Sequence, residues 1–275
     1  MAILSRTDLY QEPGRITFHA HSGVVEQGKR MKQLIKSMLG EIVASSVLDV
    51  ACGLGSSLEL LSSAPERYEH LVGIDLDFGY LRRAHSGLKA EKINLVQMDA
   101  EHMGFGPECY DLVSVFASIH HLKEPEIVIK EMLRVLRAGG SIVIVEMYND
   151  ALVAPPQNAV QIHQWAAEVD TFRGLFHHKT FARQAITNLV DQLDLEQVVY
   201  NDYVDVQADP FIPDVHTGVR NYINNRLDLV NADSVIHDTD HVKQLVQRGE
   251  ALKNQIEIDG VLSEPVIVVV GRKPA

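Results

Sequence analysis

The sequence has few cysteines and no long apolar run. Its 275 residues include 2 cysteines, too few for a disulfide framework or a thiolate metal site, so we expect a reducing, cytoplasmic setting. No stretch is apolar over the roughly 20 residues that a membrane helix needs. The start of the chain is too short and polar for a signal peptide. We therefore expect no membrane association.

Positive charge is scarce as well. Lysine and arginine number 25 against 37 aspartates and glutamates, which gives a formal net charge of −12 at pH 7. An excess of negative charge repels a phosphate backbone, and no basic cluster offsets it locally. The sequence also lacks an Asn-Pro-Pro-Tyr-like tetrad and a Pro-Cys pair, which serve enzymes that methylate nucleic-acid bases. We therefore expect a small-molecule substrate and no nucleic-acid partner.

The most informative stretch that is present is residues 47–57, VLDVACGLGSS, where an apolar run ends in glycines and small hydroxyl residues. This pattern is typical of a buried strand that breaks into a ligand-binding loop. Gly53 and Gly55 lack a Cβ, so their backbone can take positive φ and approach a ligand closely. Ser56 or Ser57 can cap a following helix, whose free N–H groups would face a carboxylate or phosphate.

Two cofactor classes use such a loop. A dinucleotide fold has Gly-x-Gly-x-x-Gly and an acidic residue about 20 residues further on. The acidic residue is present as Asp75, at the end of the apolar run 71–75, but Leu58 takes the place of the third glycine. The spacing alone therefore leaves a nicotinamide-dependent oxidoreductase open.

Residues 47–146 as a whole resemble the class I S-adenosylmethionine-dependent methyltransferases. Segments similar to motifs of that family follow one another in the expected order, namely 49–55 (DVACGLG), 73–75 (GID), 94–100 (NLVQMDA), 111–122 (DLVSVFASIHHL) and 131–140 (EMLRVLRAGG). Each motif is weak by itself, and their order and intervals carry the resemblance. The resemblance implies S-adenosylmethionine as the cofactor.

The resemblance also implies which residues bind that cofactor. Asp75 would hold both ribose hydroxyls, Leu76 would lie against the adenine, and Asp99 would reach the adenine amino group. Ala51 stands where many members carry glycine and adds a methyl group beside the methionyl end. The full implied set is Asp49, Ala51, Gly53, Gly55, Asp75, Leu76, Asp99, Ala100 and Phe116.

His120 and His121 are the candidate catalytic residues. They follow the fourth expected strand, at the carboxyl edge of the sheet where ligands of open α/β sheets bind. A sulfonium already activates its methyl group, so a general base is needed only when the acceptor is a hydroxyl or a protonated amine. Histidine suits that role because its pKa lies near the working pH. A structural role, in which one histidine only hydrogen-bonds the loop, stays open.

A metal site is not predicted, although the chain has 13 histidines. The adjacent pairs at 120–121 and 177–178 should point their side chains in different directions on a regular element. His237 and His241 could share a helix face, yet no glutamate lies between them in the zinc-protease pattern. Quinone-pathway O-methyltransferases can carry Glu-His at the turn after the fourth strand. His121 matches that histidine, but the matching glutamates are absent.

Strands alternate with helices along the chain, which predicts a doubly wound, mostly parallel α/β sheet. The expected strands are 46–51, 70–75, 93–98, 111–116, 140–146, 196–206 and 265–270, and the expected helices include 127–136 and 180–194. In the resembled family the last two strands pair antiparallel at one edge. The expected fold is therefore a seven-stranded sheet with an antiparallel last strand and helical cap additions.

The expected organisation is an N-terminal helical segment at 1–45, a methyltransferase core at 46–206 and 261–275, and a helical cap insertion at 207–260. The segments outside the conserved motifs of the resembled family should decide what is methylated. The first holds His19 and His21 ahead of an amphipathic helix. The insertion is too long for a bare loop and should cover the cleft or form a dimer contact.

The function predicted from the sequence is methyl transfer from S-adenosylmethionine to a small molecule, with oxygen, nitrogen and carbon all open as the acceptor atom. Besides the oxidoreductase, the alternatives are a non-catalytic S-adenosylmethionine-binding protein and an aminopropyl transferase. The latter needs additional acidic residues for a polyamine, and the sequence has no clear set of them. A homodimer also stays open.

Overall fold

The computed structural model describes residues 22–40, 42–63, 68–88, 92–150, 153–233 and 239–275. Side chains in the first of these ranges are described from Arg30 onward. His19, His21 and His237, which the sequence analysis singled out, lie outside the described residues. Within the described ranges, no helix combines the length and apolar character that a membrane span requires.

The described residues form one seven-stranded sheet with the strand order β3-β2-β1-β4-β5-β7-β6. Strand β7 is antiparallel to both of its neighbours, and the other pairs are parallel. The predicted fold class is therefore confirmed. The strands are β1 (Ser46–Val50), β2 (His70–Asp75), β3 (Ile93–Gln97), β4 (Tyr110–Phe116), β5 (Leu136–Met147), β6 (Glu196–Tyr203) and β7 (Val266–Arg272).

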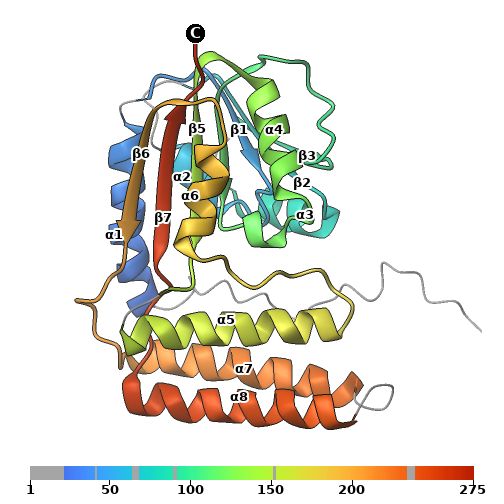
Figure 1. Cartoon of the computed structure of the whole chain (residues 1–275), viewed down its shortest axis with the longest axis vertical. Coiled ribbons are helices and arrows are strands. Elements are labelled where there is room, and N and C mark those ends of the chain that lie inside the picture. Colours follow the sequence, from blue (N-terminus) through green and yellow to red (C-terminus); the bar gives the residue numbers. More distant parts are fainter. Residues whose placement is uncertain (1–21, 41, 64–67, 89–91, 151–152, 234–238) are drawn as a thin grey trace, which may run out of the picture.

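Helices cover both faces of the sheet (Figure 1). Helices α4 and α6 pack on one face, and α1, α2 and α3 pack on the other, each side around its own buried apolar cluster. These helices are α1 (Ser22–Leu39), α2 (Ser56–Leu61), α3 (Phe78–Gly87), α4 (Pro125–Val135) and α6 (Arg183–Asp191), with a short 3₁₀ turn, η2 (Ile119–His121).

Two expected boundaries shift for local reasons. The helix predicted at 127–136 begins at Pro125, because the fixed φ of proline suits the first helical turn. The chain then enters β5 directly at Leu136 instead of at 140, with an irregular register before the regular pairing resumes. The strand predicted at 196–206 ends at Tyr203.

A third layer consists of α5 (Ala154–Phe172), α7 (Pro213–Asp233) and α8 (Thr239–Asp259), which share a separate apolar cluster. Trp165 lies in its centre, fully buried, and its indole N–H donates to the carbonyl of Leu245 at 2.9 Å. Gly249 lets α8 approach the indole, because a Cβ there would lie 2.6 Å from the Trp165 ring. The sequence division placed α5 with the core, whereas the structure packs it with the two helices of the insertion.

Figure 1 shows this helical layer lying across the end of the sheet toward which the arrows of β1 and β6 point. That end is the carboxyl edge of the parallel strands. Because side chains and loops at this edge are not consumed by strand pairing, open α/β sheets bind their ligands there. The layer therefore closes over the edge where the candidate residues were expected.

Candidate active site

A cavity of about 660 Å³ lies at the carboxyl edge of the sheet, between the glycine-rich loop and the helices α1, α5 and α7. Its volume falls in the range of about 300–1,000 Å³ that is usual for small-molecule and cofactor sites. Of the predicted residues, those that line it are Ala51, Gly53, Asp75, Leu76, Asp99, Ala100, Phe116, His120 and His121. Asp49 and Gly55 are not among its lining residues.

One end of the cavity is formed by the glycine-rich loop and Asp75. The Oδ2 atom of Asp75 accepts from the Gly53 backbone N–H at 2.8 Å, and its Oδ1 atom accepts from the Asp77 N–H at 2.9 Å. These bonds hold the carboxylate in one orientation beside the cavity. A carboxylate has two acceptor oxygens with about four lone-pair sites, a geometry that suits two neighbouring hydroxyl groups.

Asp49 supports the loop from beneath. Its side chain is fully buried and accepts from the hydroxyls of Ser57 at 2.5 Å and Ser114 at 2.8 Å. Burial raises the pKa of Asp49 to about 7, and the two hydroxyl bonds only partly oppose that rise. The side chain therefore ties β1 to the first turn of α2 and to β4.

The loop holds a non-glycine residue in a left-handed conformation. Ala51 has φ of 54°, next to glycines at positive φ such as Gly53 at 52°. A left-handed backbone costs a residue with a Cβ about 1–2 kcal/mol.

We expect Ala51→Gly to raise the free energy of unfolding by about 1 kcal/mol, because glycine relieves this strain at a small cost in chain entropy. Urea unfolding followed by circular dichroism measures the change. The control is Ala251→Gly, at an exposed position inside α8, where the same substitution should lower stability by about 0.5–1 kcal/mol. A stability loss of equal size at both positions would contradict the strain at Ala51.

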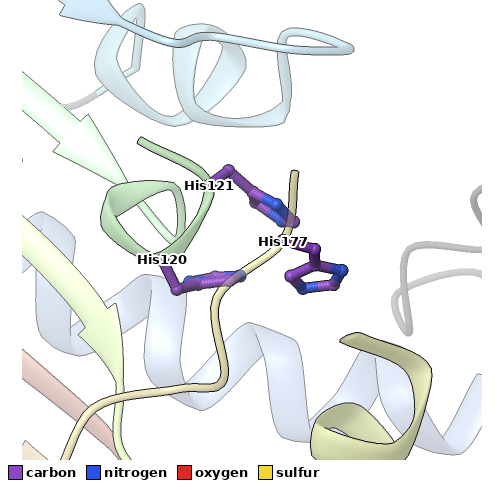
Figure 2. Close-up of side chains that lie close together, drawn as sticks. All are labelled: His120, His121 and His177. Atoms are coloured by element: carbon purple, nitrogen blue, oxygen red, sulfur yellow. The ribbon is translucent and has the colours of Figure 1, made fainter. Parts of the chain in front are cut away.

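Another part of the cavity wall contains four imidazoles, those of His120, His121, His163 and His177, which we call the histidine cluster. The ring centroids of His120 and His121 lie 4.1 Å apart, and those of His121 and His177 lie 4.3 Å apart (Figure 2). The expectation that the adjacent histidines at 120–121 would diverge is therefore wrong. They sit on the short 3₁₀ turn η2, and both rings nevertheless turn toward the cavity.

His120 is held by Glu146 at the end of β5. The fully buried Glu146 side chain accepts from the His120 Nδ1 atom at 2.9 Å, from the Ile119 N–H at 2.7 Å and from the Met147 N–H at 2.9 Å. Because a carboxylate only accepts, the proton of this imidazole is on Nδ1. In the neutral imidazole the Nε2 atom of His120 then carries a lone pair, and this atom has no hydrogen-bond partner among the described residues.

His177 and His163 are oriented in the same way. The Nδ1 atom of His177 lies 2.7 Å from Asp170 Oδ2, and the Nδ1 atom of His163 lies 3.3 Å from Glu264 Oε1. Burial lowers the pKa of His177 to about 4, although Asp170 opposes that shift. His177 is therefore neutral near pH 7.

An arginine and a tyrosine from α7 also line this part of the cavity. The Arg226 guanidinium lies 4.0 Å from the centre of the Tyr222 ring, and its Nη2 atom is 3.7 Å from Asp170 Oδ2. Its Nε–H is buried without a hydrogen-bond partner among the described residues. This part of the wall therefore presents a cation and an aromatic ring beside the histidine cluster.

The sequence analysis did not identify most of the residues that surround the histidine cluster. His163 and Arg226 lie on helices with no local motif, and only the fold brings them to the sheet edge. Glu146 carried a usable signal, because a lone carboxylate at the end of an otherwise apolar buried strand needs a partner.

Comparisons of sequence and of fold relate this chain to known methyltransferases. Residues 48–144 match the family model described as "Methyltransferase domain". The chain is 29% identical over 120 residues to a demethylmenaquinone methyltransferase from Renibacterium salmoninarum, covering 44% of this chain and 48% of that protein. It is 36% identical over 109 residues to a phosphatidylethanolamine N-methyltransferase from Cereibacter sphaeroides, covering 37% of this chain and 50% of that protein.

Among solved structures, phosphoethanolamine N-methyltransferase 2 from Haemonchus contortus, in complex with phosphomonomethylethanolamine and S-adenosylhomocysteine, superposes with a TM-score of 0.54 at 15% identity. The superposition covers 90% of this chain and 53% of that chain. The matches to the two curated relatives span about half of their length. By their motifs, their sheet and these matches, residues 48–144 are a methyltransferase domain similar to those of the class I S-adenosylmethionine-dependent methyltransferases.

Proposed function

We propose that this protein transfers the methyl group of S-adenosylmethionine to a small-molecule acceptor that enters the cavity beside the histidine cluster. The observation that carries the proposal is the oriented Asp75 carboxylate next to a glycine-rich loop at the carboxyl edge of the sheet. Two fixed acceptor oxygens suit the two neighbouring hydroxyls of a ribose.

The remaining lining residues at that end suit a nucleoside with an amino-acid tail. Leu76 is 68% exposed and offers an apolar face to a base, while the exposed Asp99 offers a carboxylate to an amino group. The backbone of Gly53 lies open to the tail, because a Cβ built there meets no atom within 4 Å. The same assignments were implied by the resemblance of the motifs.

The names of the relatives indicate different acceptors, a quinone in one case and ethanolamine compounds in the others. These names therefore do not choose an acceptor for this chain. The part of the cavity proposed for the acceptor favours a polar small molecule, because Arg226, Tyr222 and the histidine cluster line it. A negatively charged oxygen on the acceptor would pair with the Arg226 guanidinium.

S-adenosylmethionine supplies, when bound, a methyl group that its sulfonium already activates. The protein has to orient the acceptor and exclude water, and orientation alone can lower a barrier by about 7–11 kcal/mol. We assign His120 and His121 to the acceptor, where an imidazole can hydrogen-bond its nucleophilic atom and take its proton. General base catalysis of that kind contributes about 10²–10⁴-fold.

Calorimetric titration with S-adenosylmethionine, S-adenosylhomocysteine and NAD tests the cofactor assignment. We expect saturable binding of the first two and none of NAD. Tight binding of NAD alone would overturn the proposal in favour of an oxidoreductase. Transfer of a labelled methyl group from the cofactor into a metabolite extract tests turnover, and binding without any transfer would indicate a non-catalytic binding protein.

We expect Asp75→Ala to weaken the affinity for S-adenosylhomocysteine by about 1.5–3 kcal/mol, because the charge-assisted bonds to the ribose hydroxyls are lost. Isothermal titration calorimetry measures this change. Asp228→Ala removes the same charge from an exposed position on α7 and should leave the affinity unchanged. Equal affinities for the two variants would place the nucleoside elsewhere.

A further inference from the structure

The histidine cluster contains more imidazoles than methyl transfer requires. One imidazole is enough for a general base, whereas four converge in this part of the cavity. His120 is 1% exposed, and among the described residues its Nε2 atom has no hydrogen-bond partner. An unpaired buried polar atom costs about 1–3 kcal/mol, so this lone pair indicates a missing ligand.

We propose that the histidine cluster binds one divalent transition-metal ion of the zinc type, through His120, His121 and His177, with His163 as the fourth ligand. One nitrogen of each of the first three histidines lies within 4.8 Å of the other two (Figure 2). Nitrogens bound to one tetrahedral zinc ion at about 2.0–2.1 Å are about 3.3 Å apart. Small side-chain rotations bring the three rings to that spacing.

The contact between His163 and His177 already has this spacing. Their Nε2 atoms are 3.1 Å apart. The Nδ1 atom of each ring faces a carboxylate, so in the neutral rings the proton lies on Nδ1 and both Nε2 atoms carry lone pairs. Two lone pairs at this distance repel each other unless a proton or a metal ion lies between them. Two nitrogen ligands of one metal ion have nearly this spacing.

The carboxylates that contact these rings are placed as they are around metal-binding histidines. Metal-binding histidines usually donate their other ring N–H to a carboxylate, carbonyl or water, which fixes the orientation of the ring. Three of the four rings have such a carboxylate. The pairs are His120 with Glu146, His163 with Glu264, and His177 with Asp170.

The donor set selects the class of ion. Imidazole nitrogens suit zinc, copper, iron and nickel, whereas magnesium, calcium and manganese prefer oxygen ligands. The ion would lie in the cavity wall, where an oxygen atom of the acceptor can reach it as a further ligand and be polarised. With the ion bound, its ligand imidazoles cannot take a proton, so the ion and not His120 or His121 would activate the acceptor. This role in the reaction rests on the proposed function, but metal binding itself does not.

Zinc binding by the full chain, without a polyhistidine tag and after removal of metal by a chelator, tests the proposal. We expect one equivalent of Zn²⁺ to bind in calorimetry, and Co²⁺ to give the visible absorption of a low-symmetry, nitrogen-bound ion. His121→Ala and His177→Ala should each weaken zinc binding by at least about 100-fold. Glu146→Gln removes no ligand and should weaken it by about 10–100-fold.

His178→Ala is the matched control, since His178 is exposed and does not line the cavity. Its zinc affinity should equal that of the wild type. Absence of zinc binding in the folded wild type, or undiminished binding in both His121→Ala and His177→Ala, would overturn the metal site. Circular dichroism of the same samples confirms that each variant is folded, and calorimetry with S-adenosylhomocysteine reports separately on the proposed function. Failure of the wild type to bind S-adenosylhomocysteine, with zinc binding intact, would count against the proposed function alone.

Discussion

Trp165→Ala should lower the free energy of unfolding by about 3–5 kcal/mol. The indole is fully buried where α5, α7 and α8 meet, and its removal leaves a cavity and deletes the indole bond to the Leu245 carbonyl. Gly249 adds no side chain that could fill the space, because it sits directly against the ring. The site can therefore collapse only by moving whole helices.

Urea unfolding followed by circular dichroism measures this loss. Trp165 is the single tryptophan of the chain, so its fluorescence in the wild type reports on the helical layer alone. We expect the fluorescence and dichroism transitions of the wild type to coincide, because the layer and the sheet are joined through β7 and α5. Trp165→Phe keeps most of the apolar volume and should lose less stability. A loss below about 1 kcal/mol in Trp165→Ala would mean that the layer is not a tightly packed core.

The second large effect concerns pH and Asp49. Burial raises the pKa of this carboxyl to about 7 in the folded protein, above its ordinary value of 3.8. The folded state therefore holds a proton that the unfolded chain has already released. The stability from this group is fully present below its ordinary pKa and is lost as pH rises through about 7.

Relative to Asp49→Asn, the wild type should thus lose unfolding free energy on the order of 3 kcal/mol between about pH 4 and about pH 8. Urea unfolding at several pH values, without cofactor, gives the difference between the two proteins. Asparagine has nearly the same shape and can still bond Ser57 and Ser114, so titration is the main change. Parallel pH profiles for the two proteins would show that Asp49 is ionised in the folded state throughout.

The strand positions were predictable because their signal is local. Strand β2 occupies residues 70–75 as expected, and β7 forms from the β-branched run that ends at Val270. Both segments are apolar runs bounded by polar residues or proline, and a parallel or central strand needs no more information than that. The antiparallel pairing of β6 with β7 followed from the family resemblance and is confirmed.

The helical layer was less predictable. Helices in the insertion were expected, and α7 and α8 are there, but α5 was assigned to the core. An amphipathic or apolar helix must bury one face, and its sequence does not say against which partner. The choice is made by the fit of Trp165 onto Gly249, two residues far apart in the chain.

The part of the cavity proposed for the cofactor was more predictable from the sequence than the part proposed for the acceptor. Asp75 and the glycine-rich loop belong to one strand-loop-helix unit and the strand beside it, so their spacing in the sequence already indicated a nucleoside site. The residues proposed to contact the acceptor come from η2, α5, α7 and the loop that follows α5. Their meeting depends on how the helical layer docks on the sheet edge.

By itself, the amino-acid sequence determined the order of strands and helices, the family, and the loop and carboxylate proposed for the cofactor, because each depends on contacts between near neighbours or on short runs of one periodicity. Only the tertiary structure decided that His163 and His177 join His120 and His121, with carboxylates from β5, α5 and the segment before β7 in contact with three of these rings. Side chains so distant in sequence meet only after the chain has buried its apolar faces, and burial specifies which faces touch without leaving a local pattern.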